Sequence, residues 1–254
     1  MSKNLKLRFK QISFVDLVFF FFRKMIQIPD YYQFEVNLHI FAAFRLKTVT
    51  VVFIMTLSNQ ISNYLRKFTV GIAGCGGLGS NCAVALARVG VGRLIIADFD
   101  IVTEQNLNRQ YYFHDQIGRL KVHALRENIQ RINPSVVVKA FDMKLCVSDV
   151  LELYAGCDVI VEAFDKAEMK QMIIETVLTK MPGKELVVGV GMAGWGKSEI
   201  ISCRTSGNLH ICGDEVSEVS DDLPVLAPRV CMVANMQANQ VLDILLRDFK
   251  PLQP

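Results

Sequence analysis

The chain has 254 residues, of which 51% are apolar and 21% charged, so it can bury a sizeable core and is not a largely disordered protein. The formal net charge of +3 is unevenly spread. Residues 1–54 hold eight Lys/Arg and three Asp/Glu, whereas the remaining 200 residues hold 20 basic and 22 acidic side chains. This larger part is close to neutral and lacks the basic footprint of a nucleic-acid-binding protein, so no nucleic-acid partner is expected.

The first 54 residues do not fit the pattern of the rest. Basic residues precede an apolar run at 14–22, as in a secretory signal peptide, but Asp16 interrupts the run and no small-residue cleavage site follows. This run and a second one at 49–57 are both well short of the roughly 20 residues that span a membrane, so no membrane segment is expected. We predict that 1–54 is an appended segment, with Met55 as the natural start, and that 55–254 is the functional domain.

The most informative stretch lies between two apolar strands. A helix is expected at 57–67, a strand at 68–73, a helix at 80–89 and a strand at 94–97. The loop after the first strand contains four glycines: Gly74, Gly76, Gly77 and Gly79. Asp98 ends the second strand, 19 residues after the last of them. Strand, glycine loop, helix, strand and acid, in this order, form the dinucleotide-binding fingerprint.

Each part of this fingerprint has a physical role. Glycines let the backbone approach a phosphate closely, and the helix N-terminus offers free N–H groups. An acid at the end of the second strand can accept hydrogen bonds from ribose hydroxyls. We assign this role to Asp98, with Asp100 as the alternative. Packing of strand against helix is the other interpretation of the glycine loop.

The remainder of the chain alternates between strands and helices. Helices are expected at 118–132, 149–154, 166–179 and 230–246, and strands at 136–140, 158–163 and 186–190. This alternation predicts an α/β fold with a doubly wound, mostly parallel, Rossmann-like sheet. After Gly191, strands at 198–204 and 208–212 with Gly207 near the turn predict a hairpin, and the acid-rich 213–223 predicts a crossover loop.

Three further polar residues indicate a triphosphate rather than a nicotinamide cofactor. Arg109 could be an ordinary surface residue, but a planar donor soon after the ribose acid suits a phosphate. Lys121 lies near a helix N-terminus, where a cation is unfavourable unless it has an anionic partner; the alternative is a solvent-facing lysine. Asp165 ends another strand and is predicted to bind Mg²⁺, which takes one or two carboxylates beside phosphate oxygens; a helix N-cap is the alternative.

The motifs around these residues resemble the ThiF/MoeB/HesA family, relatives of the ubiquitin-activating enzymes, over about 55–248. The matching elements are the glycine loop 74–80, Asp98 with Asp100, the run 106–110, Lys121 with Val122, and Phe164 with Asp165. The run 191–196, with Pro224 and Pro228-Arg229, is most similar to the short ThiF-type adenylyltransferases. The resemblance implies ATP-dependent adenylation of the C-terminal glycine carboxylate of a ThiS-like sulfur carrier protein, with release of pyrophosphate, in thiamine thiazole biosynthesis.

The family also implies roles for single residues. Asp98 would bind the ribose, Arg109 and Lys121 the triphosphate, Asp165 the magnesium, and Asn106 would lie beside the phosphates. A homodimer is expected. Many relatives supply an arginine across the dimer from an N-terminal segment, but nothing before residue 68 matches it; Arg66 is the nearest basic candidate and a poor one. Many also carry a zinc site of two CxxC pairs, which this chain lacks, so no structural zinc is expected.

The seven cysteines are an odd number and form no CxxC pair, which suggests reduced thiols and a cytoplasmic protein. Cys203 and Cys212 are the thiols nearest the predicted crossover loop. They could take part in sulfur transfer or simply be strand residues.

Three other functions stay open at the level of sequence. An NAD-dependent oxidoreductase could use the same loop and Asp98, but would leave Arg109, Lys121 and Asp165 without a joint task. A non-catalytic partner-binding module would be expected to lose the lysine and the aspartate. A molybdopterin carrier or a tRNA-modification pathway would keep the chemistry and change the substrate.

Overall fold

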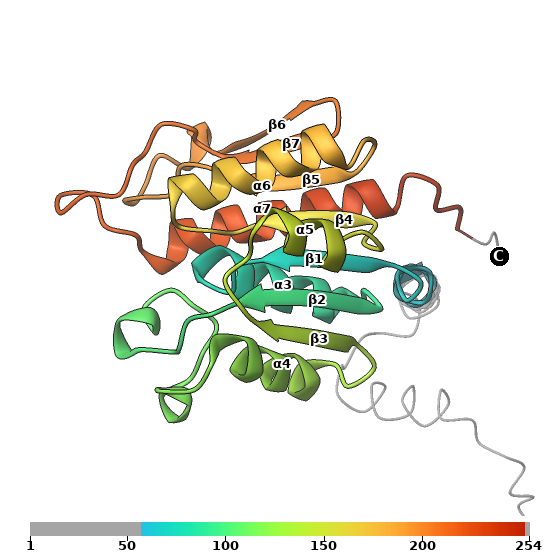
Figure 1. Ribbon diagram of the computed structural model, residues 1–254, viewed down its shortest axis with the longest axis horizontal. Coiled ribbons are helices and arrows are strands. Elements are labelled where there is room, and N and C mark those ends of the chain that lie inside the picture. Colours follow the sequence, from blue (N-terminus) through green and yellow to red (C-terminus); the bar gives the residue numbers. More distant parts are fainter. Residues whose placement is uncertain (1–56, 252–254) are drawn as a thin grey trace, which may run out of the picture. The chain divides into compact units, whose positions relative to one another are not determined.

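A seven-stranded sheet is the centre of the part of the chain that the computed structural model describes, residues 57–251 (Figure 1). Its order is β3-β2-β1-β4-β5-β7-β6. The strands are β1 (Thr69–Ala73), β2 (Arg93–Asp98), β3 (Val137–Asp142), β4 (Val159–Glu162), β5 (Glu185–Gly189), β6 (Ser202–Ser206) and β7 (Leu209–Gly213). The doubly wound, mostly parallel fold expected from the sequence is confirmed. The predicted appended segment 1–54 and Met55 lie outside the described residues.

The strand order places a ligand crevice between β1 and β4. The first five strands are all parallel and lie in the order 3-2-1-4-5, so the direction of winding reverses between β1 and β4. In open α/β sheets, ligands bind outside the carboxyl ends of the strands at this switch point. The glycine loop follows β1, and Asp165 follows β4, so both lie at this edge.

Helices cover both faces of the sheet. One face carries α3 (Gly77–Val89), α4 (Lys121–Ile132), α7 (Ala227–Leu245) and the helix 57–65, and the other carries α5 (Val147–Leu153) and α6 (Ala167–Lys180) (Figure 1). Three short 3₁₀ turns, η1 (Glu104–Asn106), η2 (His114–Gln116) and η3 (Ser198–Ile200), lie in the connections. None of the helices in residues 57–251 is long and apolar enough to cross a membrane.

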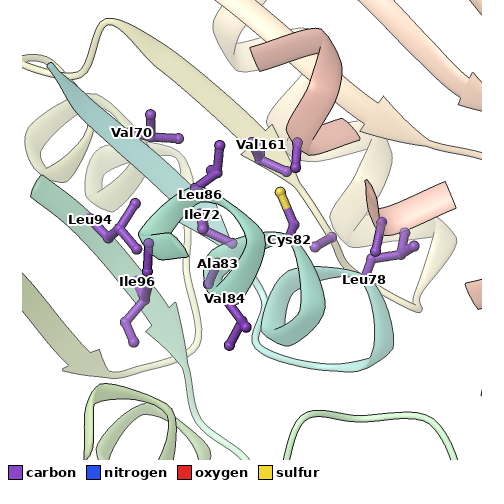
Figure 2. Packing of buried hydrophobic residues seen from close by; sticks show 14 of the residues in the cluster. Val70, Ile72, Leu78, Cys82, Ala83, Val84, Leu86, Leu94, Ile96 and Val161 are labelled. Carbon is purple, nitrogen blue, oxygen red and sulfur yellow. The ribbon is translucent and has the colours of Figure 1, made fainter. Parts of the chain in front are cut away.

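The larger core lies between the sheet and α3. Figure 2 shows apolar side chains of the strands meeting those of the helix, with Ile72 and Ile96 on the sheet and Cys82 and Leu86 on α3 all fully buried. β1 is buried along its whole length, as expected for a strand covered on both faces. Burying one such aliphatic side chain contributes about 1.5–3 kcal/mol, so this packing holds the start of α3 firmly against the end of β1.

Several element boundaries differ from the expectation. α3 begins at Gly77 rather than at 80, because the glycine run itself forms the first helical turn. α4 begins at Lys121 rather than at 118, since Gly118 takes a positive φ of 85° in the preceding turn. β6 begins at Ser202 rather than at 198, because η3 occupies the first three residues of that stretch. The first described helix ends at 65 instead of 67.

The C-terminal hairpin is confirmed. β6 and β7 are antiparallel, and Ser206 pairs with Leu209 across a two-residue loop. Gly207 begins this loop with a φ of +59°, and Asn208 is not among the positive-φ residues, which fits a type II′ turn. β7 also pairs in parallel with β5, so the hairpin extends the main sheet. Residues 214–226, which include the predicted crossover loop, contain no regular helix or strand.

Candidate active site

The glycine loop leaves an uncapped helix N-terminus at the switch point. Gly76 is the N-cap residue of α3, no side chain caps the first turn, and that turn contains no acidic residue. A Cβ added to Gly76 would meet nothing closer than Gln110 Nε2 at 3.8 Å, so the space in front of it is open. Free N–H groups that face open space at the positive end of a helix form an anion-binding site.

Gly74 and Gly79 have a different task from Gly76. Gly74 has a φ of +98°, and a Cβ there would lie 2.7 Å from the carbonyl oxygen of Ala163, which follows β4. A Cβ on Gly79 would lie 1.9 Å from the carbonyl oxygen of Gly74. These two glycines therefore allow close packing of the loop on itself and on the end of β4.

The carboxylate of Asp98 is hydrogen-bonded directly to the backbone of the glycine loop. Its Oδ2 accepts a 2.6 Å hydrogen bond from the backbone N–H of Cys75, and its Oδ1 accepts one of 2.8 Å from the N–H of Asp100. Burial raises the pKa of the Asp98 carboxyl, an effect that the Cys75 N–H and the charge of Lys121 partly offset. Of the two candidate ribose acids, Asp98 is the one that lies against the loop.

Lys121 is buried, and the alternative of a solvent-facing side chain is wrong. Its side chain is only 6% exposed, and its Nζ lies 2.7 Å from Oδ2 of Asp100. The backbone fixes this geometry, because the N–H of Lys121 donates to the carbonyl of Asp100 and Ile101 forms a β-bridge with Leu120. The cation near a helix N-terminus therefore has an anionic partner within the protein, at the same edge as Asp98.

Tyr112 links the lysine to the glycine loop and was not anticipated. Its buried hydroxyl lies 2.7 Å from the carbonyl oxygen of Cys75 and 3.4 Å from that of Lys121. The sequence signal was the second of two tyrosines that follow the polar run 106–110, which is too common a feature to single out.

Arg109 lies beside the start of α3. Its Cγ would be 3.7 Å from a Cβ on Gly77, and its carbonyl accepts a 2.9 Å hydrogen bond from Asn81. Nη1 donates to the carbonyl of Gln105 and to the side chain of Asn108, and the side chain is partly exposed. The structure thus places Arg109 beside the glycine loop, and its contact with a phosphate stays a prediction.

Asn106 has a structural task that the sequence did not predict. Its Oδ1 accepts a 3.0 Å hydrogen bond from the N–H of Thr103 and so closes the turn η1. This bond holds the loop that carries Arg109. A contact with phosphate stays a prediction.

Asp165 is exposed and has no hydrogen bond or ion pair with any residue of the range 57–251. The alternative in which its side chain caps a helix is wrong, because the N-cap residue of α6 is Lys166 and no side chain caps that helix. A free carboxylate at the carboxyl end of β4 remains available to a metal ion. No group of three or more His, Cys, Asp or Glu side chains in this range could hold a metal on its own.

A buried ion pair behind the loop was missed. Glu162, fully buried at the end of β4, lies 2.9 Å from Nζ of Lys170, and accepts a 2.7 Å hydrogen bond from the N–H of Phe164. Lys170 also donates to the carbonyl of Gly189 on β5. Burial raises the pKa of the Glu162 carboxyl, and the charge of Lys170 partly offsets this. An acid at the end of an otherwise apolar strand was the signal that could have revealed it.

A second buried ion pair, Asp214 with Arg229, anchors the start of the irregular segment to α7. Arg229 also donates to the carbonyl of Gly196, and its buried Nε has no hydrogen-bond partner among residues 57–251. Burial alone would raise the pKa of Asp214, but hydrogen bonds from the N–H groups of Ser217 and Val216 and the charge of Arg229 hold it below its usual value. Fifteen residues separate the two partners, so no local pattern indicates the pair.

The comparison with protein families decides the classification. The ThiF family model matches residues 53–253. The chain belongs to the ThiF family.

Curated relatives agree with the family. The adenylyltransferase and sulfurtransferase UBA4 of Eremothecium gossypii is 33% identical over 210 residues, which cover 77% of this chain and 46% of that protein. The ubiquitin-like modifier-activating enzyme 5 of Arabidopsis thaliana is 30% identical over 159 residues, 59% of this chain and 37% of that protein. The chain thus spans less than half the length of these two relatives.

Solved structures show the same fold. The E. coli tRNA N6-threonylcarbamoyladenosine dehydratase TcdA, solved with AMP, superposes with a TM-score of 0.67 at 20% identity, covering 74% of this chain and 90% of that one. E. coli MccB solved with ATP superposes with a TM-score of 0.57 at 20% identity, covering 76% and 60%.

Arg66, the nearest basic candidate for the arginine that relatives supply across the dimer, lies away from the glycine loop of its own chain. It lies with Phe68, Arg93 and Val137 around a hollow at the amino ends of the strands. The glycine loop is at the carboxyl ends, on the opposite edge of the sheet.

Proposed function

We propose that this ThiF-family chain adenylates the C-terminal carboxylate of a small ubiquitin-like or sulfur carrier protein, using ATP and releasing pyrophosphate. The observation that carries the proposal is the position of Lys121, buried next to Asp98 and Asp100 at the edge where the uncapped α3 begins. Such a charge suits a triphosphate, whereas a nicotinamide cofactor has little need of it.

The residues fit a nucleotide. Open space at Gly76 and the free N–H groups of α3 suit a phosphate, and Asp98 is fixed by two backbone N–H groups in a position to accept ribose hydroxyls. The reaction brings a carboxylate to a phosphate, two anions, so catalysis depends mainly on positioned positive charge. We assign this charge to Arg109 and Lys121. Lys121 is the first residue of α4, and Arg109 lies in the turn after η1, beside the start of α3.

Lys121 must exchange partners when phosphate binds. Its ammonium group now contacts Asp100, whose side chain is 47% exposed. An exposed carboxylate is easily resolvated, so moving the ammonium from Asp100 to a phosphate costs little. We infer that Asp100 holds Lys121 in place between turnovers.

Asp165 is the residue that we assign to Mg²⁺. Mg²⁺ retains several waters and binds one or two carboxylates together with substrate phosphates, so one free carboxylate is sufficient. When bound, the ion would neutralise part of the phosphate charge. The Glu162–Lys170 pair supports this assignment, because the bond from Phe164 N–H to Glu162 fixes the residue that precedes Asp165.

The carrier tail would approach past the run 191–196. Gly191 and Gly194 take φ values of 77° and 78°, and the Asp214–Arg229 pair fixes this run through the carbonyl of Gly196. Trp195 lies in the run and is 66% exposed. An exposed aromatic ring among glycines suits contact with an extended, side-chain-poor tail.

Within this activity, a ThiS-like carrier of thiamine biosynthesis is our first candidate, supported by the resemblance of 191–196 and Pro228-Arg229 to short ThiF-type enzymes. The carriers of UBA4-type and UBA5-type enzymes are the alternatives favoured by the curated relatives, beside a molybdopterin carrier or a tRNA-modification role. We also propose a homodimer, a domain of 55–254 and a cytoplasmic location.

The decisive experiment is ATP–pyrophosphate exchange with each candidate carrier in turn. Exchange should depend on one carrier and disappear when its terminal glycine is deleted. Exchange with none of them, together with tight NADH binding that Mg·ATP does not displace, would favour the oxidoreductase alternative and contradict the proposal.

A further inference from the structure

Two cysteines meet across the C-terminal hairpin, away from the adenylation site. Cys203 on β6 pairs directly with Cys212 on β7, and their sulfur atoms are 3.5 Å apart. Cys203 is exposed, whereas Cys212 is fully buried beneath α7. The sequence indicated both residues as thiols near the crossover loop. It did not predict that they meet, because their contact depends on the strand register.

The register puts the two thiols at a position that suits a disulfide. Ser206 and Leu209 flank the two-residue loop and form a hydrogen-bonded pair, and the pairs then alternate along the hairpin. The next pair, Thr205–His210, is not hydrogen-bonded, and Arg204–Ile211 after it is. Cys203–Cys212 is then again a non-hydrogen-bonded pair. Cα atoms in such pairs lie about 4.5 Å apart, within the range of about 4.4–6.8 Å that disulfides occupy.

Neighbouring contacts agree with this register. The Thr205 hydroxyl lies 2.9 Å from Nδ1 of His210, so side chains at the equivalent pair also meet across the strands. The thiol of Cys203 donates to Oε1 of Gln240 on α7 at 3.3 Å, which keeps its sulfur on the side of Cys212. Closing from 3.5 Å to a bond of about 2.05 Å then needs only a small rotation of the side chains.

We propose that Cys203 and Cys212 form a redox-active dithiol that a hydroperoxide oxidises to a disulfide, with Cys203 reacting first and Cys212 resolving it. The Cys203 sulfur attacks the terminal oxygen of the hydroperoxide, which is reduced to water or an alcohol while the thiol becomes a sulfenic acid. The Cys212 sulfur then attacks the Cys203 sulfur. Its proton and the sulfenic hydroxyl leave as water, so two thiols and one hydroperoxide give one disulfide, one water and one water or alcohol.

Exposure and acidity support this order. A hydroperoxide reaches Cys203 from solvent but not Cys212, which is covered by α7. Burial, and then the neighbouring Cys203, raise the pKa of Cys212, so its thiol stays protonated and is a poor nucleophile toward the hydroperoxide. β6 is the edge strand of the sheet, and the disulfide would join it covalently to β7.

Peptide mapping of the full-length protein tests the proposal. Arg204 is the one tryptic site between the two cysteines, so trypsin releases each of them on its own peptide, 198–204 and 205–229. The native protein is treated with hydrogen peroxide, then unfolded in urea in the presence of N-ethylmaleimide and digested without reductant. We expect these two peptides to be linked and to separate on reduction, with maleimide labelling of both falling on the order of tenfold.

The variants give the order of the reaction. Cys212→Ser should accumulate a dimedone-reactive sulfenic acid on 198–204, and Cys203→Ser should leave 205–229 unoxidised at the same dose. Cys146→Ser, which removes an exposed thiol elsewhere, should leave the linked peptide unchanged. Failure to link in a folded wild-type protein, a link from Cys212 to the buried Cys82 instead, or oxidation of Cys212 in Cys203→Ser would overturn the proposal. None of these outcomes depends on the adenylation activity.

Discussion

Nζ of Lys121 and Oδ2 of Asp100 form a 2.7 Å ion pair in which the lysine is almost fully buried and the carboxylate half exposed. Breaking the pair therefore has a different cost for each partner. Asp100 can return to water at little cost, whereas the buried Lys121 needs an anionic partner, either Asp100 or another group. A bound phosphate can therefore replace Asp100, and the pair predicts how variants of the lysine behave.

Lys121→Met should lower carrier-dependent pyrophosphate exchange by about 10²-fold, the scale of removing one positioned charge donor. Methionine retains most of the buried volume, so the loss of stability should stay near 1 kcal/mol. Exchange kinetics and urea unfolding measure the two effects. Lys144→Met, at an exposed lysine, is the matched control. Exchange near the wild-type rate in Lys121→Met would make the lysine a structural residue.

Asp165→Asn should raise the magnesium concentration needed for half-maximal exchange by on the order of tenfold, because the carboxylate that we assign to Mg²⁺ loses its charge. Stability should not change, since Asp165 is exposed and has no partner among residues 57–251. A magnesium titration of the exchange rate checks this. Glu168→Gln removes an exposed carboxylate three residues away and should behave as the wild type. Equal magnesium curves for both variants would contradict the assignment.

Two glycines of the loop should respond in opposite ways to alanine. Gly79→Ala should destabilise the fold by about 3 kcal/mol, since its Cβ would lie 1.9 Å from the carbonyl oxygen of Gly74. Gly76→Ala should fold normally and bind ATP roughly tenfold more weakly, because its methyl group projects into the open space that we assign to phosphate. Thermal unfolding and equilibrium ATP binding separate these effects. Normal ATP affinity in Gly76→Ala would place the phosphate elsewhere.

Lys170→Met should destabilise the protein by about 3 kcal/mol at pH 8, because it leaves the carboxylate of Glu162 buried and unpaired. Burial raises the pKa of Glu162, so the folded state holds this proton more tightly than the unfolded chain. The protonated Glu162 carboxyl therefore adds to the free energy of unfolding. This contribution is complete below the unfolded-state pKa of about 4.3 and is lost as the pH rises through the raised pKa of the folded state. The cost of Lys170→Met should therefore shrink as the pH is lowered towards 4.

Urea unfolding of the wild type and of Lys170→Met between pH 4 and 8 measures this. Lys180→Met, at the exposed end of the same helix, should show no such pH dependence. A cost for Lys170→Met that is the same at both ends of the range would show that Glu162 does not titrate there.

Removal of residues 1–54 should leave adenylation activity unimpaired, because every residue of the candidate site lies beyond them in the sequence. The measurement is exchange activity of a 55–254 protein, with size-exclusion chromatography to follow folding. Aggregation or inactivity would mean that the segment belongs to the functional domain.

The sequence by itself determined the Rossmann-like sheet and the edge at which the candidate site lies, because local patterns carry both. Apolar runs of strand length predict the strands, and the glycine loop followed by Asp98 predicts the connections at their ends. Both are patterns among neighbouring residues. The carboxyl ends of parallel strands must then meet at one edge of the sheet. The structure confirmed the sheet and placed Asp98 against the loop, as its spacing predicted.

Tertiary structure alone decided how the charges and thiols are partnered. The burial of Lys121 against Asp100 depends on a bridge between two loops, and the pairs Glu162–Lys170 and Asp214–Arg229 depend on how α6 and α7 pack. Cys203 and Cys212 meet because the two-residue turn at Gly207 sets the strand register, and a shift by one residue would place them on opposite faces. These contacts join residues whose spacing follows neither the helical nor the strand periodicity. They can therefore be recognised only in the folded chain.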